Sequence, residues 1–269
     1  MVISRNGIRL PVHLRGKMPR YDFVSQRLFV ETALAPDTMI DLDRAQANYL
    51  LNVLRLKDQA PVLLFNGQDG EWQAELVAQG RKKAALRVAR QTRSQPPMPS
   101  HDLLYLFAPI KQTRMEYMVQ KAVEMGVCTL QPVLTDYTQL RKVNLERMKA
   151  HALEASEQCG ILNIPAIHEP KSLKNLISDL PQDRRVLFCD EGEESQNPLS
   201  ALAALEGQEP SKLAVLIGPE GGFSEDERVL LRSQPNITPI PLGPRVLRAD
   251  TAAVAALALV QAVLGDWQD

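Results

Sequence analysis

The sequence predicts two consecutive parts, a small antiparallel β-barrel followed by an α/β domain with a parallel sheet. With 269 residues, 45% of them hydrophobic, the chain is long enough for two separate cores. Short apolar runs separated by glycine turns fill residues 22–93, whereas later runs alternate with helical repeats. A proline-rich segment separates the two patterns. We therefore expect a basic tail at 1–17, the barrel at 18–94, a linker at 95–100 and the α/β domain at 101–269.

In the front part, turn-forming dipeptides separate the predicted strands. Asn66-Gly67, Asp69-Gly70 and Gly80 mark these turns. One helix interrupts the strands, because Asp43 is a suitable N-cap and apolar residues then recur at three- and four-residue spacing from Ala47. The strands are expected at 26–30, 61–65, 72–77 and 84–88.

The rear part alternates strands with helices, which predicts a parallel sheet. An apolar stripe begins after Lys111 and stops at Gly126, and a second helix ends at Gly160. Strands are expected at 103–108, 127–133, 186–189, 213–217 and 237–240, and further helices at 144–159, 198–205, 224–232 and 250–264.

Several protein classes are excluded by composition. The most apolar stretch, 251–264, is too short to span a bilayer and predicts a buried helix. Three cysteines without a CxxC pair indicate a reducing cytoplasm, and the four histidines lack metal-ligand spacing, so we expect no membrane segment and no metal. The first seventeen residues are basic but lack a signal sequence, which leaves a basic tail or a translation start at Met18.

The charges are divided unevenly although the net charge is only −1. Residues 1–101 hold 15 basic and 9 acidic side chains, and the remainder holds 16 and 23, so the two parts carry +6 and −7. A basic cluster in the front part is able to follow a phosphate backbone, although a solvated strand and loop is the alternative. Its members are Arg81, Lys82, Lys83, Arg87, Arg90 and Arg93.

Two loops follow predicted strands at the edge where parallel sheets bind ligands. The first, GPEGGF at 218–223, leads into a capping box of Ser224 and Glu227. Glu220 and the missing Walker lysine argue against a phosphate cradle and favour a neutral or cationic ligand. A turn that needs glycine for its positive φ is the alternative.

The second loop, PLGPRVLRADTA at 241–252, carries two arginines and a carboxylate between a strand and a helix. This density favours a site, although Asp250 or Thr251 could instead cap the following helix. The dinucleotide fingerprint GxGxxG and the nucleophile elbow GxSxG are both missing, so neither chemistry is indicated.

Together these segments resemble the RsmE family of SPOUT methyltransferases, which methylate N3 of a uridine in 16S ribosomal RNA. The resemblance implies a PUA-like β-barrel that binds RNA, a trefoil knot, S-adenosyl-L-methionine as cofactor, a homodimer and 16S rRNA, in the 30S subunit, as partner. It rests on LIGPEGG at 216–222, LGPRVLRADTA at 242–252, Lys111 with Arg114 and Glu116, KAVEMGV at 121–127, EASEQCG at 154–160 and Gly265-Asp266.

The resemblance and the loop chemistry together assign site residues. Arg248 is expected to stabilise the uracil anion, with Arg245 as the alternative, and Glu220 and Asp250 are the candidate bases. Cofactor contacts are expected from Leu216, Ile217, Gly218, Pro219, Glu220, Gly221, Gly222, Pro241, Leu242, Gly243, Val246, Leu247, Arg248, Thr251 and Ala252. RNA contacts are expected from Arg20, Arg81, Lys82, Lys83, Arg87, Lys111, Arg114, Lys121 and Arg141.

The chain departs from the family pattern at three places. Ile161-Leu162 stands where an arginine is usual, the arginine near Thr135 is displaced to Arg141, and Ala249-Asp250 replaces Thr-Glu. The last change shortens the carboxylate and places its role as base in doubt. Other RNA substrates, namely tRNA or a ribose 2′-hydroxyl, a non-catalytic RNA-binding assembly protein and a nucleotide hydrolase are the rival functions.

Overall fold

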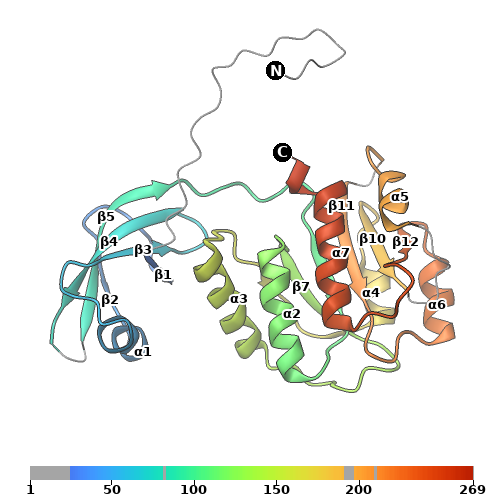
Figure 1. Cartoon of the computed structure of the whole chain (residues 1–269), viewed down its shortest axis with the longest axis horizontal. Coiled ribbons are helices and arrows are strands. Elements are labelled where there is room, and N and C mark those ends of the chain that lie inside the picture. The colour runs from blue at the N-terminus through green and yellow to red at the C-terminus, as the bar shows by residue number, and fades with distance from the viewer. Residues whose placement is uncertain (1–24, 81–82, 191–196, 209–210, 269) are drawn as a thin grey trace, which may run out of the picture.

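The computed structural model describes residues 25–80, 83–190, 197–208 and 211–268, so the predicted tail at 1–17 lies outside the described residues. Figure 1 shows a β-sheet unit built from the first part of the chain beside an α/β unit built from the rest. Each unit has a core of its own, the first formed around Leu50, Leu64 and Leu86 and the second around a larger sheet.

The first unit is a five-stranded sheet of mixed direction. Neighbouring strands pair in the order β1-β3-β4-β5-β2. The expected antiparallel pairing is found for β3-β4, β4-β5 and β5-β2 but is wrong for β1 and β3, which are parallel. A helical crossover between β1 and β3 returns the chain in the same direction. Closure into a barrel stays a prediction. The strands are β1 (Gln26–Phe29), β2 (Met39–Asp41), β3 (Pro61–Phe65), β4 (Glu71–Ala78) and β5 (Ala84–Arg93).

The helical crossover begins where the sequence predicted it. Asp43 caps α1 (Arg44–Asn48) by accepting a hydrogen bond from the backbone N–H of Gln46, whose side chain returns one to Asp43. The helix widens into a π-helical turn, η2 (Tyr49–Val53), which keeps the apolar face turned inward at Leu50.

The second unit contains a parallel sheet, as predicted. The strand order is β12-β10-β11-β6-β7-β8, and β9 (Lys171–Ser172) also pairs with β7. Two-residue strands such as β8 and β9 are too short to show a period in the sequence and were not predicted. The remaining strands are β6 (Leu104–Phe107), β7 (Thr129–Leu134), β8 (Ala166–Ile167), β10 (Arg184–Cys189), β11 (Lys212–Ile217) and β12 (Ile237–Ile240).

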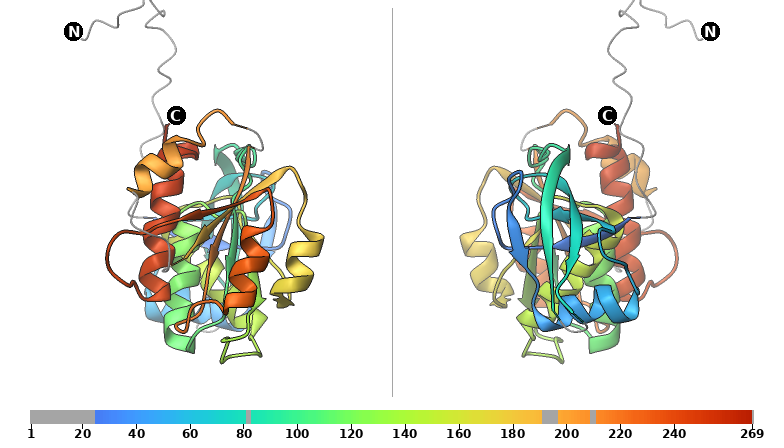
Figure 2. Two further views of the ribbon diagram at one scale, coloured as in Figure 1. Left: turned by 90° about the vertical axis from the view of Figure 1, so that its right-hand side faces the viewer. Right: turned by 90° about the vertical axis from the view of Figure 1, so that its left-hand side faces the viewer.

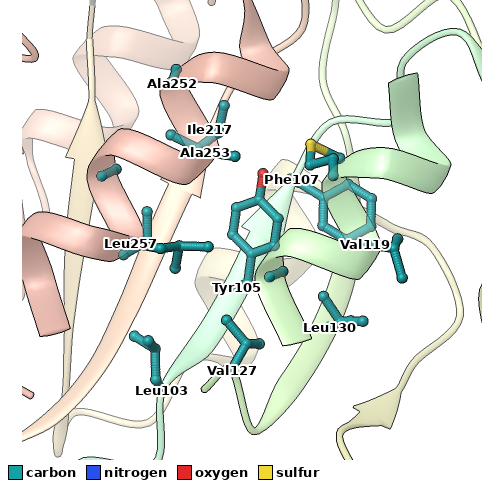
Figure 3. Close-up of a cluster of buried hydrophobic side chains, with 14 of the residues drawn as sticks. Leu103, Tyr105, Phe107, Val119, Val127, Leu130, Ile217, Ala252, Ala253 and Leu257 are labelled. Atoms are coloured by element: carbon teal, nitrogen blue, oxygen red, sulfur yellow. The ribbon is translucent and has the colours of Figure 1, made fainter. Parts of the chain in front are cut away.

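Helices cover both faces of this sheet (Figure 2). One face packs on α2 (Gln112–Glu124), α3 (Leu145–Cys159), α5 (Pro198–Ala203) and α7 (Ala249–Val263), and the other packs on α4 (Leu173–Asp179) and α6 (Glu225–Arg232). Alternate residues of each strand point to opposite faces, so Tyr105 and Phe107 enter the first core and Leu106 the second. Figure 3 shows the Tyr105 and Phe107 rings between α2 and α7. Helix α4 was not predicted.

Helix α7 begins differently from the expectation. Its N-cap is Arg248, which forms no side-chain capping bond, so capping by Asp250 or Thr251 is wrong. Both residues lie within the first turn instead. There the Asp250 carboxylate accepts a hydrogen bond from the Thr251 N–H at 3.0 Å, and its negative charge is favourable near the helix N-terminus.

A buried ion network joins the two units. Glu71 is 4% exposed and accepts hydrogen bonds from Arg27 and Arg93 at 2.9 Å. Arg93 also donates to the Gly160 carbonyl at 2.8 Å, and the Phe29 N–H donates to Glu157 at 2.9 Å. Arg93, which the sequence placed in the basic cluster, is therefore engaged at the junction between the units.

We expect Glu71→Gln to lower the free energy of unfolding by about 3 kcal/mol, because it leaves the buried Arg27 without its countercharge. Burial raises the pKa of Glu71, but hydrogen bonds from Arg93, Thr92 and Arg27 outweigh it and hold the pKa below the ordinary value. The stabilisation is therefore present at neutral pH and is lost as the pH falls through the lowered pKa. Denaturant unfolding at several pH values measures both effects.

The matched control is Glu75→Gln, which breaks the exposed pair with Arg87. We expect this variant to unfold like the wild type. If both variants lost the same free energy of unfolding, the buried network would stabilise the fold no more than the exposed pair does.

Candidate functional site

A cavity of about 610 Å³ lies at the carboxyl edge of the parallel sheet. It forms where the loops after β11 and β12 face each other across the end of β10. The lining comprises both loops and the first turn of α7. Its residues are Cys189, Asp190, Ile217, Gly218, Pro219, Glu220, Gly221, Gly222, Pro241, Leu242, Gly243, Pro244, Arg245, Val246, Leu247, Arg248, Ala249 and Ala252.

The glycine loop after β11 is a tight turn held by its own backbone. The Gly222 N–H donates to the Pro219 carbonyl at 2.9 Å, and Gly222 adopts a φ of 70° that favours glycine. A Cβ on Gly218 would lie 2.6 Å from the buried Phe223 ring. Ser224 then caps α6, and the predicted capping box with Glu227 is present. Close packing therefore fixes the loop at both ends.

Glu220 is the one carboxylate within the glycine loop. Its side chain is 37% exposed, and its Oε1 lies 3.7 Å from Nη1 of Arg114 in the first turn of α2. This partly exposed pair brings the predicted RNA contact Arg114 to the border of the cavity. Lys111, the N-cap of α2, is exposed one turn earlier.

The second loop presents its arginines to solvent at the cavity. The Arg248 side chain is 66% exposed, and its Nε lies 3.8 Å from Oδ1 of Asp250. Arg245 is also exposed, and both arginines line the cavity. Leu242 and Leu247 pack against the main core and hold the loop to the sheet. The cavity therefore combines apolar walls with two cations and the carboxylates of Glu220 and Asp190.

The end of β10 contributes lining residues that the sequence analysis missed. Asp190 is buried, and its carboxylate forms ion pairs with Arg228 Nε at 3.1 Å and Arg232 Nη2 at 3.0 Å. Cys189 precedes it, and burial raises the pKa of its thiol far above the ordinary value. Because β10 lies between β11 and β12, its carboxyl end separates the two loops. Knowledge of the strand order would have identified both residues. Pro244 and Ala249 of the second loop also line the cavity and were not among the predicted contacts.

Two predicted cofactor contacts lie outside the cavity lining. Leu216 points to the opposite face of the sheet, in the core beneath α4 and α6, because it alternates with Ile217. Thr251 is exposed on the first turn of α7. Asp250 is buried in the same turn without lining the cavity.

The predicted RNA contacts are spread over both units. Lys83 and Arg87 are exposed at the start of β5, where Arg87 pairs with Glu75. Lys121 pairs with Glu124 at 2.7 Å on α2, and Arg141 is exposed after β7. Arg20, Arg81 and Lys82 lie outside the described residues.

In the described ranges, no group of three or more histidine, cysteine, aspartate or glutamate residues could hold a metal ion. The three cysteines, all within the same ranges, are free. No described helix is long and apolar enough to cross a membrane.

Known families match both units of the chain. The RNA methyltransferase domain family matches residues 96–261, and the RNA methyltransferase PUA domain matches residues 42–89. Ribosomal RNA small subunit methyltransferase E of Rickettsia conorii is 32% identical over 236 residues, which cover 87% of this chain and 94% of the relative. The chain belongs to the RsmE family.

Solved structures of methyltransferases share this fold. A methyltransferase of Legionella pneumophila, in complex with S-adenosylmethionine, is 27% identical with a TM-score of 0.75 and covers 88% of this chain and 97% of its own. The Neisseria gonorrhoeae ribosomal RNA small subunit methyltransferase E is 24% identical with a TM-score of 0.79 and covers 90% of this chain and 99% of its own.

In this RsmE-family chain, we expect Gly218→Ala to lower the free energy of unfolding by about 1–3 kcal/mol, because the new methyl group would overlap the buried Phe223 ring. Gly221→Ala is the matched control in the same loop. Its Cβ would lie 3.3 Å from Cβ of the exposed Tyr137, so we expect a smaller loss. Thermal and denaturant unfolding compare the two, and an equal loss would contradict the packing argument.

Proposed function

We propose that this protein transfers a methyl group from S-adenosylmethionine to N3 of a uridine in 16S ribosomal RNA, uridine 1498 in the usual numbering. The observation that carries the proposal is the cavity between two family-specific loops, whose glycine turn bears a carboxylate and no lysine. Membership of an RNA methyltransferase family and the bound S-adenosylmethionine of the Legionella relative support it.

The residues of the cavity fit this cofactor. A volume of about 610 Å³ is of the size that small-molecule sites occupy. The apolar side chains of Ile217, Leu242 and Leu247 suit a nucleoside, and turn backbone groups supply donors and acceptors. Glu220 suits a sulfonium cation and would repel a triphosphate. The cofactor, when bound, supplies an electrophilic methyl group.

The arginines of the second loop stabilise the negative charge that forms on the uracil during the reaction. Loss of the N3 proton places negative charge on the uracil ring and its carbonyl oxygens. Arg248 borders the cavity with its guanidinium partly exposed, so it can donate hydrogen bonds to such a carbonyl. Asp250, 3.8 Å away, favours this placement of the guanidinium. Arg245 is the alternative donor in the same loop.

Of the two candidate bases, Glu220 is better placed. Its carboxylate lines the cavity and is partly exposed, so an incoming base can reach it. Asp250 does not line the cavity, and its Oδ1 is engaged by the Thr251 N–H. We therefore assign proton removal from N3 to Glu220 and the positioning of Arg248 to Asp250.

The remaining expectations complete the proposal. A domain boundary within 95–100, a barrel-like PUA domain for RNA, a trefoil knot around the cavity, a location in the cytoplasm and binding to the 30S subunit follow from the family. A homodimer likewise follows from the family.

The decisive experiment measures transfer from labelled S-adenosylmethionine to small ribosomal subunits from a strain that lacks this protein. Nucleoside analysis of the RNA should find N3-methyluridine. A methylated ribose or transfer only to tRNA would overturn the substrate assignment. Absence of cofactor binding would leave a non-catalytic assembly protein.

We expect Arg248→Ala to lower kcat by about a hundredfold and the affinity for S-adenosylmethionine by much less, because its charge acts on the anion formed during the reaction. Single-turnover methyl transfer and calorimetric cofactor binding measure the two effects. Arg248→Lys, which keeps the charge but not the planar fork, should retain part of the rate. Equal losses in rate and cofactor affinity would assign Arg248 to the cofactor instead.

Lys111→Ala should weaken RNA binding for all sequences and reduce the salt dependence of binding by about one counterion, since an exposed lysine at this place contacts phosphate. The matched control is Lys174→Ala on α4, an exposed lysine on the other face of the sheet. Titrations of rRNA at several salt concentrations should separate the two variants. If the salt dependence of RNA binding were unchanged in Lys111→Ala, Lys111 would not be a phosphate contact.

A further inference from the structure

Tyr137 is an exposed aromatic side chain next to the glycine loop. It is 51% exposed and lies in the turn after β7, far in sequence from both loops of the cavity. A Cβ on Gly221 would stand 3.3 Å from Cβ of Tyr137 and 3.7 Å from two ring atoms, Cγ and Cδ2. Gly221 itself lines the cavity. Tyr137 is not itself a lining residue, but its ring packs beside one, with about half of its surface uncovered.

The turn that carries Tyr137 is fixed on both sides of this residue. The Thr138 hydroxyl accepts a hydrogen bond from the Thr135 N–H at 2.8 Å, and both threonines are buried. Asp136 accepts a hydrogen bond from the Ser224 hydroxyl at 2.6 Å, and its N–H donates to Glu227 at 2.9 Å. The turn is thus joined to the N-terminus of α6, next to the glycine loop, and the backbone of Tyr137 is held there.

Cations accompany this ring in the structure and along the chain. Arg114 lies 3.7 Å from Glu220, the residue before Gly221, and Arg141 and Lys142 are exposed four and five residues after Tyr137. Exposed aromatic rings with neighbouring cations are typical of surfaces that bind unpaired nucleotides, where bases stack on rings and phosphates contact the cations.

We propose that Tyr137 is a substrate-binding residue whose ring stacks on the target uracil once that nucleotide has left its RNA stack. Stacking occupies the face of the base and leaves its edge, which includes N3, free to enter the cavity beside Glu220 and Arg248. The inference rests on the proposed function, because it names how that substrate is held. Because Tyr137 packs against Gly221, a base stacked on its ring would lie next to the glycine loop.

The test compares Tyr137→Leu, Tyr137→Phe and Tyr137→Trp in methyl transfer to unmethylated small subunits. Stacking on an aromatic residue contributes about 1–3 kcal/mol per base, so we expect Tyr137→Leu to lower kcat/KM about tenfold or more. Tyr137→Phe and Tyr137→Trp keep an aromatic face and should remain within about twofold of the wild type. Affinity for S-adenosylmethionine should be unchanged in all three.

Trp267→Leu is the control, since Trp267 is another exposed aromatic residue that belongs neither to the cavity lining nor to the predicted RNA contacts, and this variant should keep the kcat/KM of the wild type. Tyr137→Gln is a second non-aromatic variant for the case that the leucine variant unfolds at a lower temperature. Full activity of both non-aromatic variants, an equal loss in Tyr137→Phe, or a parallel loss of cofactor affinity would each overturn the inference. Failure of the wild type to form N3-methyluridine would instead overturn the proposed function.

Discussion

The position of β10 between β11 and β12 is the constraint on which the site depends. Parallel strands end at one edge, so the loops after β11 and β12 lie two strand spacings apart, about 10 Å. Direct pairing of β11 with β12 would bring the loops to half that separation and leave no room for a ligand. The end of β10, with Cys189 and the buried Asp190, forms the floor between them.

Charge is distributed around this cavity in a way that suits a cation and an anion at different stages of one reaction. Glu220 lies in the glycine loop, whereas glycine loops that bind anions present backbone N–H groups and no carboxylate. Arg114, which does not line the cavity, lies 3.7 Å from it. Arg245 and Arg248 occupy the opposite loop. A sulfonium can therefore face the Glu220 carboxylate before the proton is removed, and a uracil anion can face the arginines after Glu220 has taken that proton.

Local features of the structure were predictable from the sequence and distant pairings were not. The helices α2, α3 and α6 follow from their apolar periods and from caps at Asn144, Ser224 and Gly160. The parallel pairing of β1 with β3 and the central place of β10 depend on contacts between distant residues, for which a single sequence has no local signal. The α7 capping expectation failed because Arg248 adopts the extended N-cap conformation without a capping side chain. Tyr137 lies in no recognised sequence motif, and only its packing against Gly221 in the structure identifies it as a candidate binding residue.

The junction between the units connects the first sheet, which is expected to bind RNA, to the helices beside the cavity. Arg93 joins Glu71 of the first sheet to the Gly160 carbonyl at the end of α3, and Glu157 of the same helix accepts the Phe29 N–H. Burial raises the pKa of Glu157, whereas this N–H favours its charged form, so the contact is maintained against a desolvation cost. Because α3 packs on α2, which carries Lys111 and Arg114, displacement of the first sheet would act on the cations beside the glycine loop. An RNA held by the front unit would therefore be positioned relative to the cavity through α3 and α2, which the hydrogen bonds of the junction connect to the first sheet.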